Sequence, residues 1–203
     1  MRPMDAPVGV VLAGGASSRL GRDKATLVVG GRTLAARAAE LLARVCPEVV
    51  VADRGRGVVP GLRSVADGAG RGPAAGLLGA ARAAPGRPLV ALACDLPAVP
   101  EALLAALATP GKTRADWAAA DLVLLRTERG LEPLVARYGP RALAALEEQV
   151  AAGDYAPRHI LDRPDLRVTI VEGDELARFG DPARFLANVN APEDLARLLE
   201  SES

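Results

Sequence analysis

Two apolar patterns alternate along the chain: short unbroken runs, and longer segments in which apolar residues recur at helical spacing. An unbroken run of strand length is typical of a strand buried on both faces of a parallel sheet. The runs predict strands at residues 8–12, 48–52, 89–94 and 167–171, and a strand pair in "DLVLLRTERG" and "LEPLVARY". The second pattern predicts helices at residues 33–45, 72–84, 100–108, 140–152, 158–162 and 192–199.

The order of these elements favours one fold class. Strands that alternate with helices favour an open, mostly parallel α/β sheet with right-handed crossovers. There is no internal repeat and no linker long enough to split the chain, and "TPGKT" is typical of an ordinary turn, so one domain over residues 1–203 is expected. Ligands bind such sheets at the carboxyl ends of the strands, which directs the search to positions after Leu12, Ala52, Ala66 and Cys94.

The composition excludes several classes of protein. Half of the residues are hydrophobic, which indicates a globular chain, and a formal net charge of zero gives no global attraction for nucleic acid or an anionic membrane. Cys46 and Cys94 form no CxxC pair, so we expect small core residues and no disulfide or zinc framework. Without an apolar stretch that suits a signal peptide or a membrane helix, the cytoplasm is the expected location.

A glycine-rich, basic segment, "AGGASSRLGRDK", follows the first predicted strand. Gly14 and Gly15 have no side chains, so their backbone N–H groups can approach a phosphate closely. From Gly14 to residue 37 one acid, Asp23, opposes five bases, and this excess suits a triphosphate; the bases are Arg19, Arg22, Lys24, Arg32 and Arg37. The segment fits neither the Walker pattern nor GxGxxG, and on composition alone a surface loop of solvated arginines stays open.

Polar residues that follow later apolar runs add candidates for the same site. Asp95 leaves a buried run, where a carboxylate is costly without a cation, and Mg²⁺ accepts carboxylate and phosphate oxygens together. Asp67 precedes "GAGRGPAAG" at another strand end, although a turn or cap role would also explain it. Asn188 and Asn190 would share one face of an extended segment, or else form a turn before Pro192.

Taken together, these segments resemble the signature of the molybdenum cofactor guanylyltransferases. "LAGGASSRLGRDKATL" is similar to the family pattern LAGGxSxRMGxDKxxL, with Leu20 in place of the methionine. "GPAAGLLGA", "ACDLP", "LEPLVARY" and "NVNAPEDL" are similar to the family's GPLAGLL, CDMP, PLxALY and NxNTPEDL segments. The matches follow the family's order from residue 8 to residue 199, so the resemblance covers nearly the whole chain.

The resemblance implies a Rossmann-like three-layer nucleotidyltransferase fold around a mostly parallel sheet. It implies a cytoplasmic enzyme that transfers GMP from GTP to the terminal phosphate of molybdopterin, or of its molybdenum form, and releases pyrophosphate. Its partners would be these small molecules, with no nucleic acid and no membrane. The resemblance leaves room for transient contact with molybdoenzymes or other cofactor-biosynthesis proteins.

The family's site residues carry over by position. Leu12, Ala13 and Gly14 would line the guanine and ribose, with Asp67 helping to bind the nucleotide. Arg19 and Lys24 would supply cations to the phosphates, and Asp95 would hold the Mg²⁺ ion. Asn188 and Asn190 would lie toward the acceptor. Electrostatics and positioning would then drive the reaction, without a covalent intermediate on the protein.

Two positions depart from the family pattern. Asp53 stands where asparagine is frequent near the base, and its carboxylate could accept both N–H donors of guanine, which predicts a preference for GTP. Glu132 stands before "PL" where some relatives carry histidine, which leaves its role open. A related cytidylyl- or sugar-nucleotidyltransferase and a non-catalytic nucleotide-binding protein remain alternatives.

Overall fold

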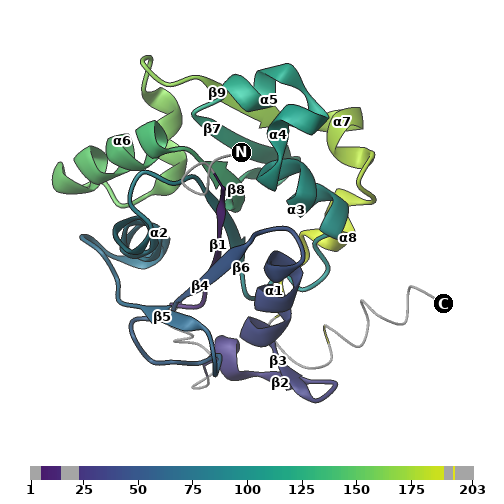
Figure 1. Cartoon of the computed structure of the whole chain (residues 1–203). Coiled ribbons are helices and arrows are strands. Elements are labelled where there is room, and N and C mark those ends of the chain that lie inside the picture. The colour runs from purple at the N-terminus through teal and green to yellow at the C-terminus, as the bar shows by residue number, and fades with distance from the viewer. Residues whose placement is uncertain (1–5, 15–22, 190–193, 195–203) are drawn as a thin grey trace.

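A seven-stranded sheet forms the centre of the computed structural model, which describes residues 6–14, 23–189 and 194 (Figure 1). Its strands are β1 (Val8–Leu12), β4 (Glu48–Ala52), β5 (Arg63–Val65), β6 (Leu89–Ala93), β7 (Leu122–Thr127), β8 (Gly130–Tyr138) and β9 (Val168–Val171), in the spatial order β5-β4-β1-β6-β8-β7-β9. A separate small hairpin pairs β2 (Val28–Val29) with β3 (Arg32–Thr33). Every strand predicted from an apolar run is present.

The sheet is mixed but mostly parallel, which confirms the expected fold class. β5, β4, β1 and β6 run in parallel, and β7 and β9 run parallel to each other. β8 is antiparallel to both β6 and β7, so it is the one reversed strand of this sheet in the described chain. Leu12 is level with Ala52 and with Ala93, so three strands end together at one edge.

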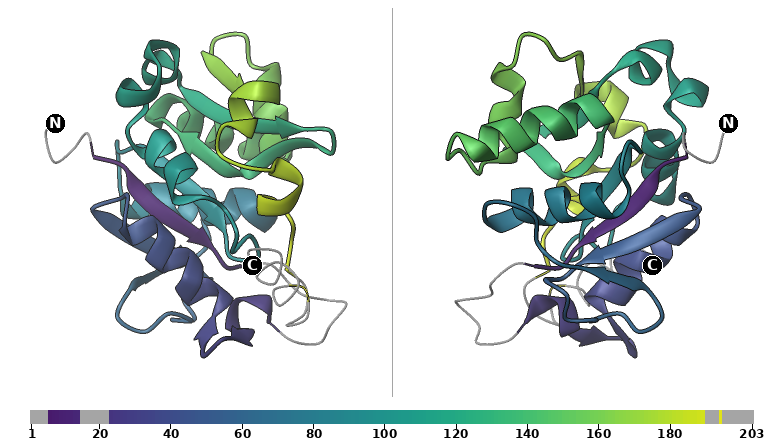
Figure 2. Two further views of the ribbon diagram at one scale, coloured as in Figure 1. Left: turned by 90° about the vertical axis from the view of Figure 1, so that its right-hand side faces the viewer. Right: turned by 60° about the vertical axis from the view of Figure 1, so that its left-hand side comes forward.

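Helices cover both faces of the sheet and make three layers (Figures 1 and 2). The α-helices are α1 (Leu34–Ala43), α2 (Gly72–Ala83), α3 (Glu101–Ala108), α4 (Pro110–Thr113), α5 (Ala115–Ala119), α6 (Pro140–Ala151), α7 (Gly173–Ala177) and α8 (Pro182–Phe185), and the 3-10 helices are η2 (Lys24–Thr26) and η3 (Pro157–Asp162). One core joins Val11 and Val51 to α1 and α3, and the other joins Val10 and Val50 to α2 and α6. Successive β1 residues therefore pack into opposite cores.

Several local expectations can be compared directly with the structure. Thr33 caps α1 as predicted, because its hydroxyl accepts a hydrogen bond from the Ala36 N–H at 3.1 Å. Both cysteines are buried in the core. The prediction of a turn at "TPGKT" is wrong, because Thr109 caps α4 and the other four residues form the whole helix. The helix expected at 158–162 is 3-10, and the one expected at 192–199 lies outside the described residues except for position 194.

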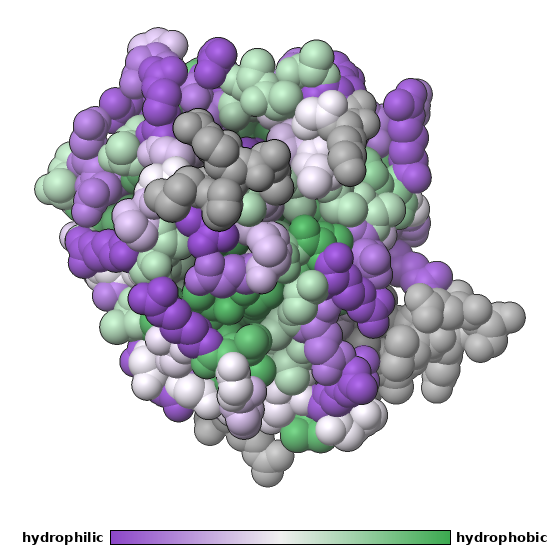
Figure 3. Space-filling view, viewed as in Figure 1, coloured by the Kyte–Doolittle hydropathy of each residue, from purple (hydrophilic) through white to green (hydrophobic). Residues whose placement is uncertain are grey.

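On the face of Figure 3, hydrophobic residues reach the surface mainly near the centre, and hydrophilic residues surround them. Among the described residues Val28 is the one large hydrophobic side chain that counts as exposed, at 57%. In the part of the chain that the structure describes, no helix has both the length and the apolarity to cross a membrane.

The chain changes direction across the sheet beside β1. After β1 it adds β4 and then β5 on one side, and it returns to place β6 on the other side. In open α/β sheets this reversal leaves a crevice at the carboxyl ends of the two central strands. The fold therefore opens a crevice beside the residues that follow β1 and β6, which are Ala13 and Cys94.

Candidate active site

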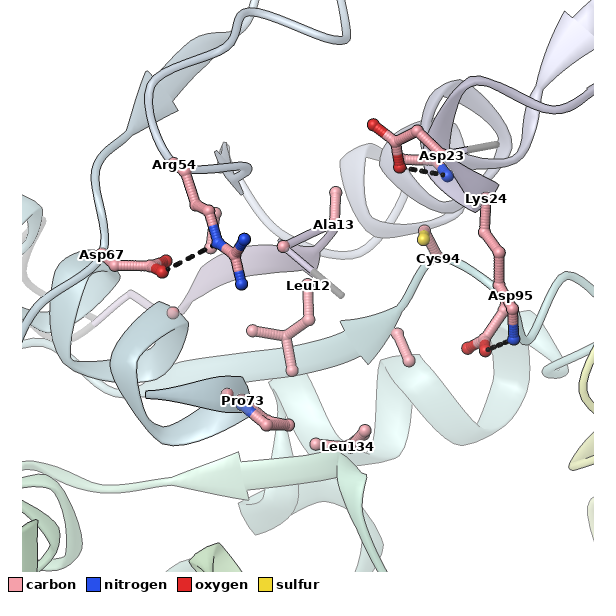
Figure 4. Close-up of a pocket in the computed structure, with 16 residues that line it drawn as sticks. Leu12, Ala13, Asp23, Lys24, Arg54, Asp67, Pro73, Cys94, Asp95 and Leu134 are labelled. Atoms are coloured by element: carbon pink, nitrogen blue, oxygen red, sulfur yellow. Dashed lines mark hydrogen bonds and ion pairs between the residues drawn. The ribbon is translucent and has the colours of Figure 1, made fainter. Parts of the chain in front are cut away.

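A cavity of about 410 Å³ lies in this crevice (Figure 4). Its walls come from the ends of β1, β4 and β6, from the start of α2 and from η2. Six residues predicted for the site line it: Leu12, Ala13, Gly14, Lys24, Asp67 and Asp95. Gly15, Arg19 and Asn190 lie outside the described residues, so their predicted roles remain predictions.

One end of the cavity holds a lysine and an aspartate. Asp95 lies two residues after the end of β6. Lys24 begins η2, whose cap Asp23 accepts a hydrogen bond from the Ala25 N–H at 3.1 Å. Lys24 Nζ lies 3.3 Å from Asp95 Oδ2, and the two side chains are 28% and 23% exposed. A carboxylate that leaves a buried strand thus meets a cation and still has an oxygen in reach of the cavity.

The opposite end holds an arginine and an aspartate. Arg54 lies in the turn after β4, and Asp67 follows β5. Arg54 Nε donates to Asp67 Oδ2 at 3.1 Å, and the two side chains are 46% and 28% exposed. Leu12 lies between this pair and the Lys24–Asp95 pair (Figure 4). Arg54 was not among the residues predicted for the site, although the positions after Ala52 were expected to face it.

Glycines bring backbone close to the cavity. A Cβ on Gly14 would lie 3.7 Å from both Arg54 Nε and Asp67 Oδ1, in the space that the bare glycine leaves open. A Cβ on Gly76 would lie 3.3 Å from Leu12 Cδ2, so α2 packs tightly against β1. The first turn of α2, with Gly72 and Pro73, therefore lines the cavity and directs the positive end of the helix dipole toward it.

Asp53 does not lie where a base-reading residue must lie. Its side chain is fully buried, and it is not part of the cavity wall. Its carboxylate accepts hydrogen bonds from the Arg56 N–H at 3.2 Å, the Val58 N–H at 2.8 Å and the Ser64 hydroxyl. The expectation that Asp53 accepts the guanine donors is therefore wrong for this structure, because its carboxylate is buried away from the cavity and already accepts these three hydrogen bonds.

Fewer of the five bases that follow Gly14 are found at the cavity than the sequence predicted. Of these five bases Lys24 reaches the cavity, whereas Arg32 forms an exposed ion pair with Glu40 and Arg37 is not in the cavity wall. Arg19 and Arg22 lie outside the described residues. The turn after β4 contributes Arg54 to the cavity instead.

Cys94 lines the cavity but is not suited to attack a substrate. Burial is the largest effect on its thiol, followed by the nearby Asp95 carboxylate, and together they raise its pKa to about 12. The thiol is therefore neutral at physiological pH. His159 is half exposed and pairs with Asp154 at 2.8 Å.

A second cavity, of about 830 Å³, lies between the β7–β8 hairpin and helices α7 and α8. Glu132 lines it, and Leu134, two residues later on β8, lines the first cavity. Burial raises the pKa of Glu132, the nearby Arg129 opposes this, and the Asp95 charge adds to it. Glu132 thus lies within electrostatic range of Asp95, and the two cavities share one strand.

Asn188 is exposed and lines neither cavity in the described chain. Its neighbour Val189 donates its N–H to the Asp95 carbonyl at 2.8 Å. The segment that contains Asn188 is therefore fixed beside the loop that carries Asp95.

Comparison with known proteins gives consistent matches. Residues 9–168 match the model of the MobA-like NTP transferase domain. The chain is 32% identical over 192 residues to a probable molybdenum cofactor guanylyltransferase of Pelotomaculum thermopropionicum, covering 93% of this chain and 90% of that protein. It also matches the crystal structure of molybdopterin-guanine dinucleotide biosynthesis protein A from Archaeoglobus fulgidus, with a TM-score of 0.77, 26% identity, and coverage of 97% and 100%.

A third match is to a structure that contains a bound metal ion. The structure of Rv0371C from Mycobacterium tuberculosis in complex with manganese matches with a TM-score of 0.61 and 22% identity, over 97% of this chain and 98% of that one. At this identity the likeness extends to the fold alone. It shows that the same architecture occurs in a protein whose structure contains a divalent cation.

Proposed function

We propose that this chain, which belongs to the MobA-like NTP transferase family, transfers GMP from GTP to the terminal phosphate of molybdopterin or of its molybdenum form, releasing pyrophosphate. The observation that carries the proposal is the Lys24–Asp95 pair at the carboxyl end of β6, inside the cavity beside β1. A carboxylate and a point cation together suit a metal-bound triphosphate.

Asp95 would anchor a Mg²⁺ ion. Mg²⁺ keeps several waters and binds through one or two carboxylates together with substrate phosphates, so one carboxylate at the cavity wall suffices as its protein ligand. Asp95 fits this requirement because it is 23% exposed and opens onto the cavity. When bound, the ion would neutralise charge on the phosphates and on the departing pyrophosphate.

The remaining chemistry requires no nucleophile from the protein. An oxygen of the acceptor phosphate is already anionic and forms a bond to the α-phosphorus of GTP, while the bond from that phosphorus to the bridging oxygen of pyrophosphate breaks. The neutral Cys94 thiol agrees with such a direct transfer. Lys24 would hold the negative triphosphate, so that catalysis rests on positioning and electrostatics.

The acceptor would approach along the side of Asp95 that faces the second cavity. Three features support this direction: the second cavity is the larger, β8 borders both, and Val189 ties the Asn188 segment to the Asp95 loop. Asn188 and Asn190 keep their proposed place on this side. We further expect the reaction to take place in the cytoplasm, with transient contact to molybdoenzymes or other cofactor-biosynthesis proteins.

A product assay tests the proposal. The protein is mixed with Mg²⁺, molybdopterin and one nucleoside triphosphate at a time, and the products are weighed by mass spectrometry. We expect a dinucleotide that contains GMP, together with pyrophosphate. A product formed with CTP at an equal rate would favour the cytidylyl alternative, and nucleotide binding without any product would favour the non-catalytic one.

A further inference from the structure

Arg54 has an unusual backbone conformation. In the described chain it is the one residue other than glycine with a positive φ, at 64°. L-residues pay a steric penalty in this left-handed region, and such strain persists where surrounding contacts enforce it, often at functional sites. The conformation therefore needs a structural explanation and a functional one.

The structural explanation lies in the turn after β4. Asp53 holds one side of it through its buried carboxylate, which binds the Arg56 and Val58 N–H groups. Gly55 donates its N–H to the Val65 carbonyl at 3.2 Å, and Arg56 Nε donates to the Asp53 carbonyl at 2.7 Å. These contacts fix the turn on both sides of Arg54 and enforce its conformation.

The turn directs the Arg54 guanidinium into the cavity, beside Asp67 and over Leu12 (Figure 4). Arg54 Nε is occupied by Asp67. Among the residues that the structure describes, no hydrogen bond involves Arg54 Nη1 or Nη2. The outer fork of the guanidinium is therefore available to a ligand that offers two adjacent acceptors.

The position of this fork indicates which part of a nucleotide it meets. Phosphates belong near Lys24 and Asp95, and Arg54 lies at the opposite end of the cavity (Figure 4). Between the two ends lie Leu12 and Pro73, apolar side chains that suit the faces of a base. A nucleotide with its phosphates at one end thus presents its base to Arg54.

We propose that Arg54, paired with Asp67, is the residue that reads the base as guanine. Guanine offers N7 and O6 as adjacent acceptors, which match the fork of an arginine. Its N1–H and 2-amino donors follow next to O6, on the side where an adjoining carboxylate accepts. Adenine and cytosine carry an amino donor in place of O6 and an acceptor in place of N1–H, so the same pair meets both with the wrong polarity.

This inference rests on the proposed function and assigns a specificity-determining residue within it. It also assigns the base-reading role, predicted from the sequence for Asp53, to Arg54 instead. Asp53 holds the turn, and Arg54 contacts the base. Asp53 is thus a positioning residue that acts through Arg54.

The test measures binding, so that it is independent of the transfer reaction. Dissociation constants for GTP, 7-deaza-GTP and ATP, each with Mg²⁺, are measured by calorimetry for the wild type, Arg54→Lys and Arg54→Asn. Lysine keeps the charge without the fork, and asparagine tolerates a positive φ, so the fold is preserved. Arg82→Ala is the matched control, because Arg82 on α2 forms an exposed ion pair with Glu147 on α6 and does not line the cavity.

The expected result is a selective loss. The wild type and Arg82→Ala bind GTP about tenfold to a hundredfold more tightly than ATP, and severalfold more tightly than 7-deaza-GTP, which lacks the N7 acceptor. In Arg54→Lys and Arg54→Asn both preferences fall to near one. Unchanged preferences, or an equal loss for all three nucleotides that would indicate a phosphate or ribose contact, would overturn the inference.

The outcome of this test is separable from that of the product assay. A chain that shows these binding preferences but makes no dinucleotide would lose the transferase assignment and keep Arg54 as its guanine reader. A chain that transfers GMP with Arg54 variants as selective as the wild type would keep the assignment and lose the inference.

Discussion

The two ends of the cavity contain similar groups in different settings. At each end a cation pairs with an aspartate that follows a strand, at 3.3 Å for Lys24–Asp95 and at 3.1 Å for Arg54–Asp67. Lysine is a compact point charge, whereas the planar arginine fork matches a defined set of acceptors. Similar charges at the two ends therefore do not select the same ligand. The lysine end suits phosphates and a metal, and the arginine end suits a base.

Arg56 links the two ends. Its guanidinium forms an ion pair with Asp23, the cap of the helix that carries Lys24. It also donates to the carbonyl of Asp53, in the turn that carries Arg54, and to the Ala13 carbonyl, both at 2.7 Å. Although its side chain is 39% exposed, Arg56 thus connects the catalytic end with the recognition end.

The largest effect should come from Asp95→Asn. The substitution preserves shape and removes the charge that anchors the metal, so we expect turnover to fall at least about a thousandfold. The GTP-to-ATP affinity ratio should not change, because the Arg54 end is intact. Rates are measured by pyrophosphate release and the ratio by calorimetry, and wild-type turnover in Mg²⁺ would remove Asp95 from the mechanism.

Arg56→Ala should disturb both ends. We expect kcat/KM for GTP to fall about a hundredfold, because small misplacements of positioned groups reduce rates by this factor. The ratio of kcat/KM for GTP to kcat/KM for ATP should also fall. Steady-state kinetics with each nucleotide would measure this, with Arg82→Ala as the control. Loss of activity at an unchanged ratio would mean that Arg56 does not position Arg54.

Lys24→Arg should lower kcat/KM by a smaller factor and leave the preference for guanine unchanged. The fork is not equivalent to a point charge at a tight phosphate site, so we expect kcat/KM to fall about tenfold. Base preference should persist in this variant. Full activity of Lys24→Arg in the same kinetic assay would contradict a tight phosphate contact.

The smallest expected effect is a difference in the free energy of unfolding between two substitutions in the turn after β4. Asp53→Ala removes the acceptor of three hydrogen bonds from a buried site and should lower the free energy of unfolding by about 2–4 kcal/mol. Arg54→Asn should change it by less than about 1 kcal/mol, because relief of the positive φ offsets the loss of a half-exposed ion pair. Urea unfolding of both variants measures the difference, and equal losses would refute these separate roles.

The sequence predicted the catalytic end better than the recognition end, for a physical reason. Leu12, Lys24 and Asp95 lie in or just after apolar runs and a glycine-rich motif, so local pattern was enough to find them. The choice between Asp53 and Arg54 depends on a positive φ and on Ser64 from the neighbouring strand. Neither the turn conformation nor that contact across strands is written in the local sequence.

The same distinction applies to the fold. Strand positions followed from unbroken apolar runs, because a strand buried on both faces requires them. The reversed direction of β8 and the cavity that it shares with α7 and α8 depend on packing between distant segments, which single-chain periodicity does not contain.

One measurement tests the division between the two ends most directly. Wild type and Arg54→Lys are each given molybdopterin, Mg²⁺ and an equimolar mixture of GTP, ATP and CTP, and the dinucleotide products are weighed. The total rate reports on the Lys24–Asp95 end, and the distribution of bases reports on the Arg54–Asp67 end. Guanine dinucleotide is expected as the predominant product of the wild type, and a mixture of bases without a predominant one is expected from Arg54→Lys. Equal use of CTP by the wild type, or guanine dinucleotide as the predominant product of Arg54→Lys, would contradict the division between the two ends.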